Sequence, residues 1–194
     1  YPAFYGIYDQ ELVGTDAVIS SCGLVFTSVP AGVSEELAEA CVAKGARMID
    51  MGADFRLKNE ADYREWYKGE YRNKALHAEA VYCIPELHRA RITKDTRIIG
   101  NPGCYPTSIA LGLAPVLSAK LAVPSGIVID SKSGTSGSGR GLTQTTHFPE
   151  CDEAFSAYKV AAHRHTPEIE QTIRELTGES AAVSFVPHLL PLIR

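Results

Sequence analysis

The strongest constraint on the fold is an alternation of strand, helix and strand near the start of the chain. Residues 23–29 (GLVFTSV) are rich in β-branched and aromatic side chains, which is typical of a buried strand. A helical segment follows at 34–45 (SEELAEACVAKG), with Ser34 as the expected N-cap and Gly45 as the expected stop. Residues 46–51 (ARMIDM) form the next expected strand. Two strands joined through a helix lie parallel, so the sequence predicts a βαβ unit and an α/β fold.

The alternation continues along the rest of the chain. Short strands are expected at 97–100, 126–130 and 181–186, and helices at 60–68, from Pro106 onward, and from Thr166 to Gly178. In the last helix Thr166 is the expected N-cap, because Pro167 then takes the first helical position.

Composition excludes several classes of protein. The 194 residues are 45% hydrophobic with a formal net charge of -4, and no basic stripe marks a nucleic-acid binder. No apolar run approaches the roughly 20 residues that span a bilayer, and no signal-peptide pattern is visible. The five cysteines contain no C-x-x-C pair, so we expect no metal site, reduced thiols and a cytoplasmic location.

Cys104 is the one cysteine with a chemically suggestive setting. It lies between an expected strand and an expected helix, and Pro106 is expected at the first helical position. Unpaired N–H groups and the dipole at a helix entrance favour a thiolate, the form that attacks carbonyl carbon. The local sequence equally fits a structural cysteine in a turn.

Two histidines, His163 and His165, precede the helix that begins near Thr166. Histidine titrates in the range that a proton donor and acceptor needs, and a nearby cation would support a thiolate. Tyr158 and Glu168 flank the pair and could position a polar substrate. The alternative is a solvated basic patch.

A segment rich in Gly, Ser and Thr covers 131–141. It follows a strand without opening an obvious helix, so it is neither a Rossmann fingerprint nor a P-loop. Its backbone N–H groups suit a flat or anionic ligand. Composition alone also fits a flexible linker.

Three motifs carry a resemblance to a known family: GNPGCYPT (100–107), SKSGTSGSGRG (131–141) and YKVAAHRHTPEIEQ (158–171). GADFRL (52–57) and IPELHR (84–89) add weaker support. In this order they resemble N-acetyl-γ-glutamyl-phosphate reductase, along nearly the whole chain.

The resemblance implies a partial Rossmann-type nucleotide domain at 1–102. A catalytic domain like that of glyceraldehyde-3-phosphate dehydrogenase would follow at 103–194, incomplete at its C-terminus. The implied nucleophile is Cys104 and the implied acid/base residue is His163. The implied substrate-binding residues are Arg56, Tyr158, His165 and Glu168. The implied NADP-binding residues are Pro30, Ser133, Gly134, Ser136 and Gly137.

The resemblance also implies the reaction and the assembly. NADPH would reduce the small molecule N-acetyl-γ-glutamyl phosphate through a cysteine thioester, in arginine biosynthesis. The partner would be another copy of the chain, in a homo-oligomer for which a tetramer is the family expectation; nucleic acid and membrane are not expected partners. The family's G-x-x-G-x-x-G fingerprint is absent before residue 23, so these residues alone are expected to bind NADP poorly and to have little or no activity.

Three other functions remain open on the sequence. An enzyme like aspartate-semialdehyde dehydrogenase would share the chemistry. A cysteine hydrolase or acyltransferase would use Cys104 and His163 without a nucleotide. A non-catalytic α/β fragment would only pack against a partner.

Overall fold

The computed structural model describes residues 2–193, which form two compact units. The first unit contains the residues up to Lys58 together with Tyr71–Asn101. The second contains Asn59–Glu70 together with the residues from Pro102 onward. The sequence placed one boundary near residue 102 and assigned the segment 59–70 to the first domain. This segment groups with residues far away in the chain, which local patterning does not reveal.

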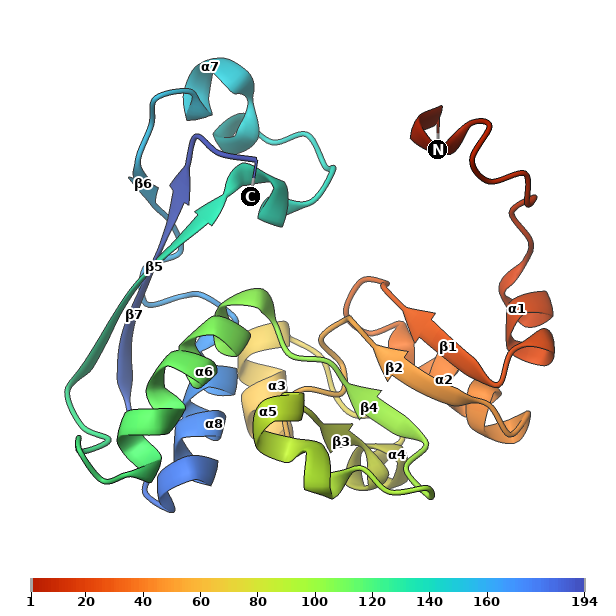
Figure 1. Ribbon diagram of the computed structural model, residues 1–194, viewed down its shortest axis with the longest axis horizontal. Helices are drawn as coiled ribbons and strands as arrows, with labels where there is room; N and C mark the ends of the chain where they lie inside the picture. The colour runs from red at the N-terminus through yellow and green to blue at the C-terminus, as the bar shows by residue number, and fades with distance from the viewer. Residues whose placement is uncertain (1, 194) are drawn as a thin grey trace. The chain divides into compact units, whose positions relative to one another are not determined.

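The first unit is built on a four-stranded parallel sheet with the order β1-β2-β4-β3 (Figure 1). The strands are β1 (Leu24–Thr27), β2 (Arg47–Asp50), β3 (Val81–Tyr82) and β4 (Ile98–Gly100). Its helices are α1 (Thr15–Ser21), α2 (Ser34–Ala43), α4 (Lys74–Glu79) and α5 (Pro85–His88), with the 3₁₀ turns η1 (Pro2–Phe4) and η2 (Arg89–Arg91). The predicted α/β class and the parallel βαβ unit are confirmed.

The core of the first unit joins α2 to the sheet. Ala38 and Cys41 of α2 are buried with Met48 of β2 and Ile98 of β4. Successive side chains of a strand point to opposite faces of the sheet, which is why buried residues recur at every second position of β1 and β2.

Ser34 is the first helical residue of α2 and not its N-cap, a correction to the sequence prediction. The cap position belongs to Val33, which makes no side-chain cap hydrogen bond. The Ser34 hydroxyl instead donates to Asp50 at 2.8 Å. The carboxylate of Asp54 accepts the N–H groups of Ser34 (2.9 Å) and Gly32 (2.8 Å), so it stabilises the start of the helix in place of a cap residue.

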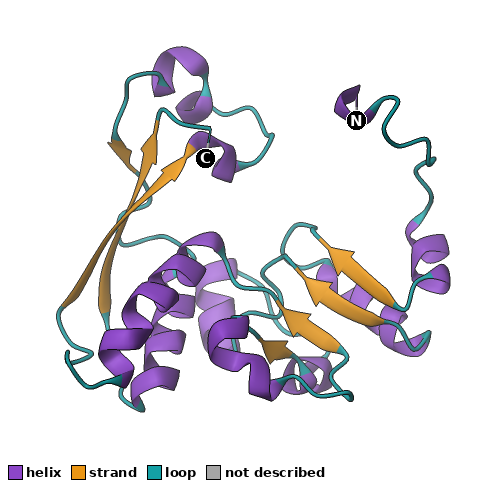
Figure 2. Ribbon diagram, in the orientation of Figure 1, coloured by secondary structure: helices purple, strands orange, loops and turns teal. Residues whose placement is uncertain are grey.

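The second unit contains a three-stranded sheet of order β5-β7-β6. Strands β5 (Ile127–Gly134) and β7 (Val183–Leu190) pair in parallel, and β6 (Ser156–Ala157) pairs antiparallel with β7. The helices are α3 (Glu60–Tyr67), α6 (Cys104–Ser118), α7 (Phe148–Cys151) and α8 (Thr166–Thr177), with the 3₁₀ turns η3 (Thr135–Ser138) and η4 (Gln144–Thr146). Figure 2 shows α6 and α8 lying side by side.

Both helices contribute to one core with the sheet of this unit. Ile109 of α6 and Ile173 of α8 are buried together with Ile129 of β5 and Phe185 of β7. This layer of two helices against a parallel strand pair holds the first turns of α6 and α8 in fixed positions.

Two elements are longer than the sequence predicted. Strand β5 continues to Gly134, so the first part of the segment 131–141 is strand and not loop. Strand β7 runs from Val183 to Leu190, beyond the predicted end at residue 186. The long parallel ladder between them satisfies the backbone whatever the side chains, so it overrides the weak strand propensity of Ser and Gly.

Two helix starts also differ from prediction. Helix α6 begins at Cys104, two residues before Pro106. A proline in the first turn is tolerated there because that N–H would have no helical partner. Helix α8 begins at Thr166, with His165 in the cap position. The predicted stop at Gly178 is confirmed, with a left-handed φ of 76°.

Candidate active site

Cys104 is exposed at the first position of α6. The residue before it, Gly103, has extended backbone angles, and its carbonyl accepts the first helical hydrogen bond from the Thr107 N–H at 3.0 Å. The N–H groups of Cys104 and Tyr105 therefore lie in the first turn, where an α-helix offers no internal acceptor. A sulfur beside these groups and the positive end of the helix dipole is well placed for anionic chemistry.

Gly103 connects the start of α6 to the start of α8. Its N–H donates to Oε1 of Glu168 at 2.9 Å, and both residues are buried. A Cβ atom at position 103 would lie 2.5 Å from Nε2 of His165, closer than real Cβ atoms approach. The site therefore requires glycine directly before Cys104, because the His165 ring occupies the space of a side chain.

Tyr105 is the central residue of the site, and sequence reasoning gave it no role. Its ring meets those of His163 and His165 edge to face, with centroids 5.5 Å and 6.0 Å away. Its hydroxyl accepts from the Tyr158 hydroxyl at 3.1 Å and donates to the His188 carbonyl at 3.4 Å. The helical periodicity could have identified Tyr105, because it places this side chain in the core when that of Cys104 faces solvent.

His163 is 9% exposed and packs between aromatic rings. Its Nδ1 accepts the backbone N–H of His165 at 3.1 Å, so the neutral ring carries its hydrogen on Nε2. Burial, followed by the charges of Lys159 and Arg164, lowers the pKa of His163 from 6.5 to about 4. At neutral pH the ring is an uncharged donor through Nε2–H, and not the solvated cation of a basic patch.

Tyr158 contacts His163 and lies close enough to Cys104 to be affected by its charge. Its ring meets that of His163 with centroids 5.5 Å apart. Burial raises the pKa of Tyr158 well above 10, with contributions from the hydrogen bond and charge of Tyr105 and from the charge of Cys104. Tyr158 therefore remains a hydroxyl donor, and a thiolate at Cys104 is close enough to affect it.

The structure thus brings together five of the residues singled out from the sequence. Cys104, Tyr158, His163, His165 and Glu168 lie in one cluster of the second unit, linked through Gly103 and Tyr105. The cluster combines two aromatic hydroxyls, a buried neutral imidazole and the N–H groups of a helix entrance with an exposed thiol. Such an arrangement can capture a carbonyl carbon on sulfur and stabilise negative charge on its oxygen.

The glycine-rich segment is folded and tied to the end of the chain. Ser133 and Gly134 end β5, while Ser136 and Gly137 lie in η3. The N–H of Thr135 donates to the Leu192 carbonyl at 2.8 Å. A Cβ at Gly137 would come within 2.9 Å of Ser133 Oγ. The alternative of a flexible linker is therefore wrong for 133–138.

Arg56 and Pro30 lie in the first unit. The Arg56 guanidinium is 9% exposed and donates to the carbonyls of Asn101 (2.8 Å) and Met51 (2.9 Å). These bonds hold the chain where it leaves β4 and β2. Pro30 is exposed, three residues after the end of β1, at the carboxyl edge where parallel sheets bind ligands.

Residues 2–193, which the structure describes, show neither a metal site nor a membrane-spanning helix. They contain no group of three or more His, Cys, Asp and Glu side chains arranged to hold a metal ion. No helix among them combines the length and apolarity that crossing a bilayer requires.

Two family models match consecutive parts of the chain. The model described as "Semialdehyde dehydrogenase, NAD binding domain" matches residues 3–95. The model described as "Semialdehyde dehydrogenase, dimerisation domain" matches residues 104–194, beginning at the exposed cysteine.

Curated relatives are similar over the whole chain. A protein of Brachyspira hyodysenteriae is 50% identical over 200 residues, covering 100% of this chain and 57% of its own length. A protein of Clostridium kluyveri is 47% identical over 194 residues, covering 100% of this chain and 56% of its own length. Both are named N-acetyl-gamma-glutamyl-phosphate reductase. The chain thus spans somewhat more than half the length of these relatives.

Solved structures share the fold at low sequence identity. Aspartate semialdehyde dehydrogenase II from Vibrio cholerae superposes with a TM-score of 0.61 at 14% identity, covering 90% of this chain and 53% of that one. Aspartate semialdehyde dehydrogenase from Candida albicans, solved with NADP, gives 0.57 at 11% identity, covering 89% and 48%.

Proposed function

The chain belongs to the semialdehyde dehydrogenase family, and we propose that it forms the catalytic part of an N-acetyl-γ-glutamyl-phosphate reductase. The enzyme would reduce N-acetyl-γ-glutamyl phosphate to N-acetylglutamate 5-semialdehyde and phosphate, in arginine biosynthesis in the cytoplasm. The relatives' names support the substrate, and the cluster around Cys104 supports the chemistry.

Cys104 acts as the nucleophile. Its thiolate attacks the γ-carbonyl carbon, a C–S bond forms, and the C–O bond to phosphate breaks with the electron pair leaving on phosphate. The product is a thioester, whose carbonyl accepts hydride more readily than that of a carboxylate. Hydride addition gives a thiohemiacetal oxyanion, which collapses as the C–S bond breaks and the electron pair returns to sulfur.

We assign His163 the role of stabilising the oxygen of these intermediates. From the sequence we expected it to donate and remove a proton. The bond from the His165 N–H to Nδ1 leaves Nε2–H as the donor, and the low pKa keeps the ring neutral. A neutral donor can hold the oxyanion without transferring its proton, and the N–H groups at the start of α6 supply further donors.

The substrate-binding roles are assigned to Tyr158, His165 and Glu168. The Tyr158 hydroxyl stays protonated and donates its one hydrogen to Tyr105, so its oxygen remains to accept from the substrate. Glu168 and the His165 ring position Gly103. Arg56 is the candidate for an anionic group of the substrate, in addition to its bonds to Asn101 and Met51.

The cofactor is a nicotinamide nucleotide, which we propose to be NADP. When bound it supplies the hydride. The turn that follows β5 suits this cofactor. A side chain at Gly137 would meet Ser133, so the backbone at this position is left uncovered. Ser133, Gly134, Ser136 and Gly137 would hold the nicotinamide end, and Pro30 the nucleotide at the edge of the parallel sheet.

The dimerisation-domain description of the matched model supports a homo-oligomer, and we propose a tetramer. Residues 104–194 would form the contacts between copies. Sedimentation of the full-length protein measures this assembly directly.

The observation that carries the proposal is the exposed Cys104 at the entrance of α6, next in the chain to Tyr105, whose ring contacts the buried imidazole of His163. The test uses the full-length enzyme and follows NADP reduction with N-acetylglutamate 5-semialdehyde and phosphate. We expect a rate that requires both phosphate and the acetylated aldehyde. Greater turnover of aspartate semialdehyde would reassign the substrate. Acyl transfer or hydrolysis without nucleotide would reassign the reaction.

A further inference from the structure

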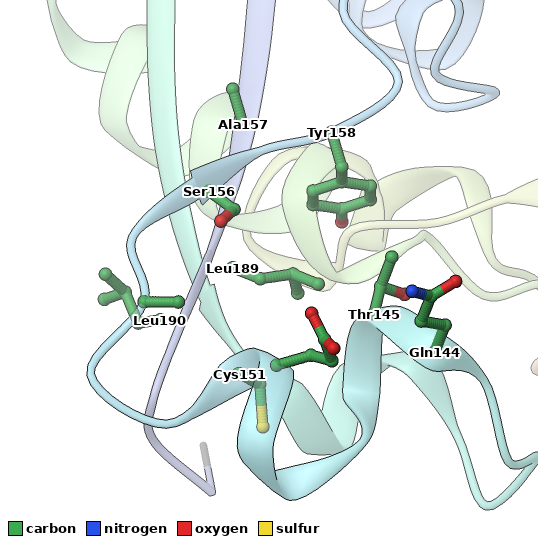
Figure 3. A pocket seen from close by; sticks show the side chains of 10 residues that line it. Gln144, Thr145, Cys151, Ser156, Ala157, Tyr158, Leu189 and Leu190 are labelled. Atoms are coloured by element: carbon green, nitrogen blue, oxygen red, sulfur yellow. The ribbon is translucent and has the colours of Figure 1, made fainter.

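The second unit contains a pocket of about 230 Å³ that shares one wall with the cluster around Cys104 (Figure 3). The shared residue is Tyr158, whose hydroxyl donates to Tyr105, the neighbour of Cys104 in the chain. One water takes about 30 Å³ of liquid volume, so the pocket has room for roughly seven groups of that size. This is the scale of one substituent of a metabolite rather than of a nucleotide.

The walls of the pocket combine polar and apolar side chains (Figure 3). Gln144 and Thr145 come from η4 and Ser156 comes from β6, and all three present uncharged hydrogen-bonding groups. Leu189 and Leu190 at the end of β7 supply apolar surface. A ligand group that suits this mixed lining carries a donor, an acceptor and a small hydrocarbon part.

The charge of the lining residues restricts which ligand group the pocket can bind. Among the described residues that line the pocket, Glu150 is the only charged one, and no lysine or arginine is present. A phosphate or carboxylate placed here would lack a cation and would face the Glu150 carboxylate. An ammonium group would suit Glu150 but would be desolvated against Leu189 and Leu190.

We propose that this pocket binds the acetamido group of the acylated substrate and so determines its specificity. The inference rests on the proposed function and extends it to a part of the substrate remote from the reacting carbon. The amide N–H and C=O would bond to polar groups among Gln144, Thr145 and Ser156. The methyl group would pack on Leu189 and Leu190. Tyr158 would then contact the substrate between its reacting carbon and this group.

The test compares two aldehydes that differ only in the acetamido group. N-acetylglutamate 5-semialdehyde carries it, and 5-oxopentanoate lacks it. With the full-length enzyme, NADP and phosphate, we expect kcat/KM to favour the acetylated aldehyde at least about tenfold, because a filled pocket adds binding energy. Phosphate-dependent turnover without this preference would overturn the pocket assignment alone. An absence of turnover with wild-type enzyme would overturn the proposed function instead.

Two substitutions locate the preference in the pocket. Ala154→Leu places a larger side chain at the lining, and Gln144→Leu removes an amide without filling space. We expect both to reduce the preference several-fold or more, mainly through a higher KM for the acetylated aldehyde, with 5-oxopentanoate unaffected. The matched control is Ala119→Leu, at the exposed end of α6.

The following results would overturn the assignment of the pocket to the acetamido group. If kcat/KM falls by the same factor for both aldehydes in both pocket variants, the effect is structural and the inference is overturned. An unchanged preference for the acetylated aldehyde in both variants would also overturn it. Gln144 is exposed, so its variant remains informative if Ala154→Leu fails to fold. A wild-type preference for aspartate semialdehyde over the acetylated aldehyde would assign the pocket to an ammonium group and contradict the proposal.

Discussion

The Oε1 atom of Glu168 accepts the backbone N–H of Gly103 at 2.9 Å, and both residues are buried. A side chain in the first turn of α8 thus fixes the residue that precedes Cys104. The same glycine touches the ring of His165 at the start of α8. Two helix starts 62 residues apart in the sequence therefore hold the cysteine and the histidines in one geometry.

Glu168 should affect both stability and the chemistry at Cys104. In Glu168→Ala the buried Gly103 N–H loses its acceptor, which costs about 1–3 kcal/mol of unfolding free energy. Glu168→Gln keeps an acceptor oxygen and should lose less. Urea unfolding and the rate of Cys104 alkylation by iodoacetamide measure the two effects.

The matched control is Glu170→Ala on the same helix. Glu170 also accepts a backbone N–H, that of Val183 at 3.1 Å, but makes no bond to Gly103. We expect a smaller loss of stability, because water can reach this partly buried bond, and unchanged alkylation of Cys104. Equal alkylation rates in the alanine variants of Glu168 and Glu170 would remove the positioning role of Glu168.

Gly103→Ala should damage the site, because the new methyl group would clash with the His165 ring. The required shift costs about 1–3 kcal/mol, the usual range for overpacking a filled site. Gly112→Ala is the control, since it lies inside α6 with nothing within 4 Å of the added Cβ. That change should stabilise the protein by about 0.5–1 kcal/mol. Thermal unfolding and turnover of the two variants give the comparison, and full activity in Gly103→Ala would contradict the geometry.

Cys104→Ser should abolish turnover while leaving the cofactor bound. A hydroxyl is a far weaker nucleophile than a thiolate, and we expect a loss of at least about 10³-fold in kcat. The exposed Cys22 provides the control, and Cys22→Ser should retain full activity. NADPH binding followed by fluorescence should be the same in both variants. Near-normal turnover of Cys104→Ser would eliminate the proposed mechanism.

His163 should make the stability of the protein depend on acid. Its pKa is about 4 in the folded state and 6.5 for an ordinary solvated histidine, so the unfolded state takes up a proton first as the pH falls. The contribution of His163 to the free energy of unfolding should therefore be constant above pH 6.5. It should fall between pH 6.5 and 4, by up to about 3 kcal/mol over that window. In His163→Asn this part of the slope should vanish.

Urea unfolding at pH 7, 5.5 and 4.5 measures the difference between wild type and His163→Asn, so the other titrating groups cancel. Identical pH dependence in the two proteins would contradict a buried neutral ring. The pH–rate profile of the enzyme gives a second measure, in which a limb due to His163 should lie near pH 4 and disappear in the variant.

Local patterning revealed most of the secondary structure. The β-branched run at 23–29 and the stops at Gly45 and Gly178 follow from residue-level preferences, and they hold in the structure. The predicted N-cap at Ser34 is wrong because Asp54, twenty residues later, supplies the oxygen that the helix start needs. Partners at that separation do not appear in a local pattern.

The sequence by itself determined the α/β class, the position of Cys104 beside a helix start, and the motifs shared with the reductases. Side-chain periodicity and turn chemistry act over a few residues, so they can be read from the chain. Only the tertiary structure packed Tyr105 against both histidine rings, brought Oε1 of Glu168 to the Gly103 N–H and turned Nδ1 of His163 toward the His165 N–H. These contacts depend on how α6, α8 and β7 pack, and burial then sets the protonation of His163, because an imidazole removed from water holds its charge poorly.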